Sequence, residues 1–171
     1  HEALAEGRGA LLVGAHAGSF EALHAAGSQL EALRVAMVMY PDNARMIHAV
    51  LEALAPGFRL DVIAIGRSGS TLAIRDWLDG GGLAGMLGDR LPPGDDGRSA
   101  VTLPFLGVPA RFGDGPFRLA QLLRRRVVFM AAVYRGGNRY DVRFEPLADF
   151  RTRSDDAAER AQALQRAVQA Y

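Results

Sequence analysis

The feature that most constrains the fold is a regular alternation of short apolar runs with longer amphipathic stretches. The apolar runs have the length and composition of strands and occur at residues 10–13, 34–40, 60–65 and 83–87. The stretches between them have helical spacing and occur at 19–30, 43–54 and 70–78. Helices inserted between consecutive strands favour a parallel sheet covered by helices.

The second half of the chain has a different pattern. A loop rich in proline, glycine and aspartate is expected at 90–99, and the segments after it are a strand at 101–105, a helix at 115–124, a strongly buried strand at 126–134, its hairpin partner at 139–145 and a terminal helix at 157–171. A hairpin adds an antiparallel strand. We therefore predict an α/β fold with a mixed, largely parallel central sheet flanked by helices, formed by residues 1–171 as one domain.

The composition excludes several functional classes. The chain has no cysteine, so disulfides, thiol catalysis and zinc–thiolate sites are excluded. A formal net charge of +1 gives no bulk electrostatic argument for a nucleic-acid partner. The apolar runs are shorter than the ~18 residues expected of a bilayer-spanning helix. The sequence therefore predicts an ordinary globular domain.

A candidate general base follows the first apolar run, in the segment GAHAGSFE at residues 14–21. Gly14 and Gly18 bracket a turn that delivers His16 at the end of a buried strand. Ser19 is a suitable N-cap for the next helix, whose first turn contains Glu21. A carboxylate that holds one imidazole nitrogen protonated leaves the other free to accept a proton from an alcohol. The segment thus indicates a histidine base with an orienting acid.

A structural interpretation of the same residues remains open at this point. A histidine in a loop between strand and helix is often a polar residue satisfied by its surroundings. A glutamate in the first helical turn also interacts favourably with the helix dipole. The spacing of His16 and Glu21 alone does not decide between the two.

Other polar loops are expected beside His16, because the carboxyl ends of parallel strands meet at one edge of a sheet. They contain Asn43, Arg67, and the adjacent charges of Asp89 and Arg90. Asp89 at a buried strand end needs a partner, which could be His16, Arg67 or Arg90. The loop GRSGST at 66–71 lacks the Gly-Lys-Ser/Thr of a P-loop. Both an ion pair that fixes the loop and a substrate-binding role fit Asp89.

These residues belong to a longer series of blocks in a fixed order along the chain. His16 and Glu21 are separated by four residues, Arg67 precedes a helix, and the pair Asp89-Arg90 follows a strand. Two further blocks are FLGVPA at 105–110 and GPFRLA at 115–120. In this series the chain resembles the bacterial lipid A late acyltransferases, which add lauroyl or myristoyl groups and belong to the lysophospholipid acyltransferase superfamily. The segments GMLGDR at 85–90 and YRGGNRYD at 134–141 are most similar to those of the branch found in aryl polyene or xanthomonadin pigment clusters.

The resemblance implies a glycerolipid acyltransferase-like fold and acyl transfer. The donor would be a thioester of acyl-carrier protein or coenzyme A, and the acceptor a hydroxyl of a lipid-type molecule, with no cofactor and no metal. His16 would deprotonate the acceptor hydroxyl and Glu21 would hold the imidazole. Substrate would be bound by Ser19, Asn43, Arg67, Asp89 and Arg90, and an apolar groove would be lined by Phe20, Phe105 and Phe112.

The resemblance also implies a place in the cell, namely the cytoplasmic face of the bacterial inner membrane. The N-terminal membrane helix and the C-terminal aromatic segment usual in lipid A enzymes are not found in this sequence, and its acidic loop reads Asp-Arg rather than Asp-x-Asp. Leu91 and Phe112 are the expected members of an exposed apolar patch beside the catalytic edge. Two alternatives stay open, a non-catalytic lipid- or carrier-binding module and a thioester hydrolase.

Overall fold

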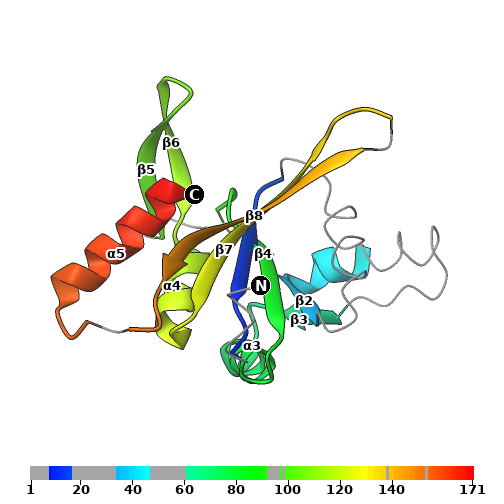
Figure 1. The fold of residues 1–171 in the computed structure, drawn as a ribbon. Helices are drawn as coiled ribbons and strands as arrows, with labels where there is room; N and C mark the ends of the chain where they lie inside the picture. Colours follow the sequence, from blue (N-terminus) through cyan, green and yellow to red (C-terminus); the bar gives the residue numbers. More distant parts are fainter. Residues whose placement is uncertain are drawn as a thin grey trace.

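A six-stranded sheet forms the centre of the molecule, and a separate two-stranded hairpin stands beside it (Figure 1). The computed structural model describes residues 8–16, 34–46, 61–91, 97, 99–137, 139–152 and 154–171. The order of strands across the sheet is β3-β2-β4-β1-β7-β8. Their bounds are β1 Leu11–Gly14, β2 Val35–Met39, β3 Asp61–Ala64, β4 Leu83–Leu87, β7 Arg126–Tyr134 and β8 Tyr140–Asp149. All neighbours are parallel except β7 and β8, which are antiparallel. The predicted α/β class with a mixed, largely parallel sheet is confirmed.

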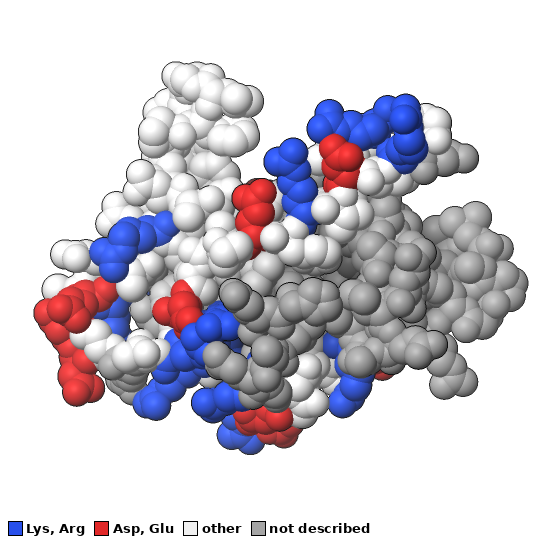
Figure 2. All heavy atoms as spheres, in the orientation of Figure 1, with Lys and Arg blue, Asp and Glu red and all other residues white. Residues whose placement is uncertain are grey.

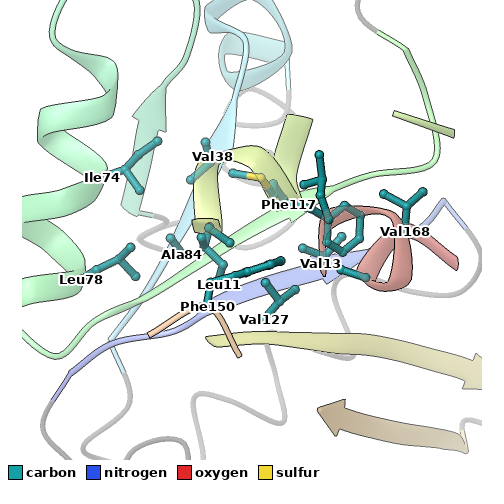
Figure 3. Packing of buried hydrophobic residues seen from close by; sticks show 14 residues of the cluster. Leu11, Val13, Val38, Ile74, Leu78, Ala84, Phe117, Val127, Phe150 and Val168 are labelled. Atoms are coloured by element: carbon teal, nitrogen blue, oxygen red, sulfur yellow. The ribbon is translucent and has the colours of Figure 1, made fainter. Parts of the chain in front are cut away.

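The larger buried cluster lies on one face of this sheet, and a smaller one of Ala10, Leu12, Leu83 and Met130 lies on the other. Leu11 and Val13 point to the same face of β1 because side chains alternate along a strand, and both are fully buried. They pack with Ala84, Met86 and Val127 of the two neighbouring strands. Figure 3 shows how residues from the helices close over this layer. Burial of these side chains holds β1 at the centre of the fold.

Three described helices supply the other half of the core. They are α3 (Ser70–Asp79), α4 (Gly115–Leu123) and α5 (Ala157–Ala170), and residues 41–46 are also helical. The Asp156 carboxylate caps α5 by accepting a hydrogen bond from the backbone N–H of Ala158 at 2.8 Å. The buried face of α5 joins Phe117 of α4 in the core, so this helix has its packing partner within the domain.

The separate hairpin consists of β5 (Ala100–Phe105) and β6 (Val108–Gly113). The sequence pattern predicts β5 but not β6, because Pro109 interrupts the β6 run. The structure tolerates this proline because the two-stranded hairpin leaves every position on an edge strand. β8 likewise extends past the predicted end at residue 145 to Asp149, through Pro146. It too is an edge strand.

The topology aligns the predicted polar loops along one edge. Strands β1, β2, β3 and β4 are mutually parallel, so the loops that follow them emerge at the same edge of the sheet. β1 and β4 are direct neighbours, whereas β2 and β3 lie beyond β4. The loop after β4 is therefore the one placed beside the loop after β1.

Candidate active site

His16 and Asp89 form the centre of the candidate site. The imidazole Nδ1 lies 2.9 Å from Oδ1 and 3.1 Å from Oδ2 of Asp89. The backbone N–H of His16 donates a second hydrogen bond to Oδ2 at 3.1 Å. Of the three partners considered for Asp89, the structure selects His16. One carboxylate thus holds both the ring and the main chain of the histidine.

The sheet brings these two residues together across 73 positions of sequence. β1 ends at Gly14 and pairs with β4 through Leu87, and the Gly88 N–H donates to the Gly14 carbonyl at 2.9 Å. Gly14 is needed for close approach rather than for a positive φ, because an added Cβ would lie 3.0 Å from the Met130 carbonyl oxygen. The strand ends therefore place His16 and Asp89 side by side.

The pair determines which imidazole nitrogen is available for chemistry. An ionised carboxylate accepts hydrogen bonds only, so Nδ1 carries the proton and donates to Asp89. In the neutral imidazole, Nε2 is then the nitrogen without a proton, on a side chain that is 42% exposed. An imidazole with one nitrogen held by a carboxylate is compatible with general-base chemistry.

The surroundings keep Asp89 ionised. Partial burial raises the pKa of this carboxyl, but the hydrogen bonds from the ring and backbone of His16 outweigh it, and the pKa lies below its usual value. The carboxylate side chain is 26% exposed, so solvent screens it only in part. Asp89 thus remains a hydrogen-bond acceptor at neutral pH and keeps the imidazole in one tautomer.

Tyr171 contacts the end of β1 next to the His16–Asp89 pair. Its hydroxyl donates to the Gly14 carbonyl at 2.8 Å, and its ring lies edge-on to Phe117 and Phe129. Burial and the nearby charge of Asp89 raise the pKa of this phenol, so it stays a donor. Tyr171 could not be identified from the sequence, because nothing in the pattern of α5 indicates that the residue after this helix reaches β1.

The other predicted site residues lie along the same edge at different distances from His16. Arg90 follows Asp89 directly and is exposed. Asn43 follows β2, two strand positions from β1, and Arg67 follows β3, three positions away. Three positions correspond to about 14 Å in the plane of the sheet. Within the described residues, neither guanidinium group is hydrogen-bonded or ion-paired to His16 or Asp89. The structure thus does not bring Asn43 or Arg67 together with the His16–Asp89 pair.

Some predicted residues lie outside the described part of the chain. These are Ser19, Phe20 and Glu21, and their assigned roles stay predictions. Phe105 and Phe112 are described, with ring centroids 5.7 Å apart in an edge-to-face pair on the β5–β6 hairpin. The described residues contain no group of three or more His, Asp or Glu side chains that could hold a metal ion. No described helix is long and apolar enough to cross a membrane.

The structure thus places a histidine at the carboxyl edge of β1, with its ring held by a carboxylate from the loop after the neighbouring strand β4. The sequence profile of a family described as bacterial lipid A biosynthesis acyltransferase matches residues 1–170. The chain belongs to this acyltransferase family. Comparison with individual curated proteins gives no match.

Proposed function

We propose that this protein transfers an acyl group from a thioester to a hydroxyl of a lipid-type acceptor, with His16 as the general base. The observation that carries the proposal is the hydrogen bond between Nδ1 and Asp89, which leaves Nε2 free. Family membership supports acyl transfer to a lipid. The donor is proposed to be a thioester of acyl-carrier protein or coenzyme A, with no cofactor, at the cytoplasmic face of the inner membrane. The aryl polyene branch stays part of the proposal.

The proposed reaction needs only one base and no acyl-enzyme. Nε2 takes the proton of the acceptor hydroxyl while the oxygen attacks the thioester carbonyl carbon. The tetrahedral intermediate collapses, the C–S bond breaks, and the imidazolium returns its proton to the departing thiolate. Asp89 stabilises the imidazolium while it exists, as the acid of a triad does. The products are an ester and a free thiol.

Substrate recognition is proposed to extend along the carboxyl edge of the sheet. Arg90 lies next to the pair and suits a phosphate or carboxylate close to the reacting centre. Arg67, three strands away, suits the far end of a long donor or acceptor. Exposed guanidinium groups bind such anions without first breaking a strong internal pair. Their replacement by alanine is expected to raise KM more than it lowers kcat.

The decisive experiment compares three single substitutions in one thiol-release assay. The protein is incubated with acyl-carrier and acyl-CoA thioesters, with and without candidate lipid acceptors. His16→Ala should lower the rate by about 10²–10⁴-fold. Asp89→Asn should have an effect of similar order, because the amide no longer imposes the reactive tautomer. Glu21→Gln shows whether a second acid acts on the same ring.

The assay also separates the alternatives. Thiol release only in the presence of an acceptor supports transfer. Release without any acceptor would indicate a thioester hydrolase. No release from any thioester would indicate a lipid- or carrier-binding module, and equal rates for wild type and His16→Ala would refute His16 as the base.

A further inference from the structure

Two hairpins project beyond the edge of the sheet that carries His16. β1 pairs with β7 only as far as Met130, so residues 131–134 of β7 and their partners 140–143 of β8 continue past the end of β1. The β5–β6 hairpin starts beside the loop after β4, where an added Cβ on Gly113 would lie 3.5 Å from the Arg90 carbonyl oxygen. Figure 1 shows both hairpins projecting on the same side of the sheet.

The tip of the β5–β6 hairpin is apolar and exposed to solvent. Leu106 is 89% exposed, and Phe105 and Val108 beside it are more than half exposed. From Ala100 to Gly113 the only charged residue is Arg111. In Figure 2 the outer part of this projection carries no charged side chains. Exposure of these apolar side chains to water does not stabilise the domain, and such patches mark interaction sites.

The backbone conformation at this tip is unusual for a residue with an apolar side chain. Leu106 and Gly107 form a two-residue turn, with φ values of 50° and 85°. Turns with two positive φ values favour asparagine followed by glycine. A leucine with positive φ is uncommon, and backbone strain of this kind gathers at functional positions. No packing within the protein compensates for Leu106, since the side chain is almost wholly in solvent.

The β7–β8 hairpin has a different and complementary composition. Its outer part exposes Arg135, Arg139 and Arg143, against the single acid Asp141. Tyr134 and Tyr140 lie between these charges with ring centroids 5.4 Å apart. Figure 2 shows the basic side chains gathered on this projection. Arginine with tyrosine is the composition of surfaces that meet anionic lipid headgroups.

We propose that the two hairpins together form the surface by which the protein docks on an anionic bilayer, with the catalytic edge between them. The apolar tip around Leu106 enters the headgroup region, and the arginines of β7–β8 contact lipid phosphates. This deepens, and rests on, the proposed use of a lipid acceptor. It also assigns the exposed apolar patch to the turn at Leu106 and Gly107 of the β5–β6 hairpin, in place of Leu91 and Phe112. An acidic carrier protein would be attracted by the arginines, but the uncharged tip offers it no group for an ion pair.

The test is direct vesicle binding by the purified chain, measured by sedimentation with phosphatidylcholine alone and with phosphatidylcholine and phosphatidylglycerol in equal parts. Leu106→Asn should weaken binding to both vesicles by about tenfold. Asparagine suits the positive φ, so the hairpin is retained. Arg139→Gln should weaken binding to the mixed vesicles alone, by about fivefold at low salt and less at high salt.

Two matched controls replace the same residue types away from these hairpins. Leu122→Gln changes an exposed leucine of α4, and Arg75→Gln changes an exposed arginine of α3. Neither should alter vesicle binding. Equal binding by wild type and Leu106→Asn, or no binding by wild type, would overturn the proposal. So would a dimer lost in Leu106→Asn, or an acidic carrier protein bound through Arg139 while vesicles are not.

Failure of this proposal is distinguishable from failure of the proposed function. His16→Ala should bind vesicles as wild type does but lose thioester turnover. Leu106→Asn should keep turnover when the thioester and the hydroxyl acceptor are both water-soluble, while losing vesicle binding. Intact turnover without vesicle binding refutes the docking surface alone. The expected vesicle pattern without turnover in any variant refutes the catalytic role and leaves the docking surface standing.

Discussion

The Asp89 carboxylate restrains His16 through two different groups, the ring and the backbone N–H. A carboxylate that accepted only from the ring would leave the loop after β1 free to turn the imidazole away. The backbone bond removes that freedom, so the position of Nε2 follows from the position of β4. Asp89 therefore orients the imidazole by restraining the backbone of His16 as well as its ring.

The His16–Asp89 pair should make stability depend on pH in a definite direction. The pKa of Asp89 is lower in the folded protein than its ordinary value of about 3.9. Its contribution is therefore fully present above that value and is lost as pH falls through the lowered folded pKa. Urea unfolding should show that the advantage of wild type over Asp89→Asn becomes smaller as the pH is lowered from about 5 to below about 4. An advantage that grows over this range would contradict the assignment.

Tyr171 is expected to act on the reaction through Gly14. Tyr171→Phe removes the hydrogen bond to the Gly14 carbonyl but keeps the edge-on contacts of the ring. Gly14 retains the bond from Gly88, so the loss of stability should be small, about 0.5–1.5 kcal/mol. We expect kcat to fall while KM is unchanged, measured by steady-state thiol release. A change in KM alone would show that Tyr171 contacts substrate instead.

Strand β1 depends on a residue without a side chain at its last position. Gly14→Ala would place a Cβ 3.0 Å from the Met130 carbonyl oxygen and 3.2 Å from its Cγ. The carbonyl belongs to β7 and cannot move away freely, so we expect a loss of about 1–3 kcal/mol in the free energy of unfolding.

A matched control for this substitution is Gly80→Ala at the end of α3. The φ of Gly80 is −76°, and outside its chain neighbours an added Cβ there meets no atom closer than 3.5 Å. Stability should change by less than about 0.5 kcal/mol, because no neighbouring atom has to move for the methyl group. Chemical denaturation of both variants checks the pair. Equal losses would show that the cost at Gly14 is not steric.

The elements that could be predicted from sequence are those with strong burial patterns. β4 at Leu83–Leu87 and β7 at Arg126–Tyr134 have the predicted bounds, because continuous apolar runs of that length fit a strand buried on both faces. β6, with Pro109, and the extension of β8, with Pro146, were missed, although β5 was predicted through Pro104; all three prolines lie in edge strands. Edge position depends on the whole sheet and not on local sequence.

The position of His16 was predictable from the sequence, but its pairing with Asp89 was not. A histidine at the end of β1 follows from the local pattern of strand, glycine and polar loop. The pairing with Asp89 requires β4 to lie beside β1, and the order of parallel strands is not encoded in the spacing of any motif. The sequence left Asp89 with three possible partners for this reason. Glu21 lies outside the described residues, and its role stays a prediction.

At the scale of the whole molecule, the ion pair of a buried arginine lies at the edge of the sheet opposite the candidate site. Arg125 precedes β7 and is 3% exposed, and it forms an ion pair with Asp79 at the end of α3. Its Nε and Nη1 atoms have no hydrogen-bond partner among the described residues. Asp79 is therefore its essential counter-charge. This pair joins elements at the amino ends of β4 and β7, away from His16.

We expect Asp79→Asn to lower the stability of the fold without changing the rate of thioester turnover. The substitution leaves a buried guanidinium without its anion and should cost about 1.5–3 kcal/mol of unfolding free energy. kcat/KM at a temperature well below the unfolding transition should match wild type, because no residue of the candidate site is touched. Thermal unfolding and the thiol-release assay measure the two quantities on the same sample. A large fall in kcat/KM in the fully folded variant would show that the two edges are coupled.

The central position of β1 has a consequence for how activity is gained during folding. Both neighbours of β1 come much later in the chain, β4 at residues 83–87 and β7 at 126–134. Contacts between distant segments form late, whereas local hairpins such as β5–β6 close early. His16 has its acid only after β4 has inserted between β1 and β2. During refolding, the return of turnover should therefore coincide with the slowest structural phase, so catalysis reports completion of the sheet and not the formation of its local elements.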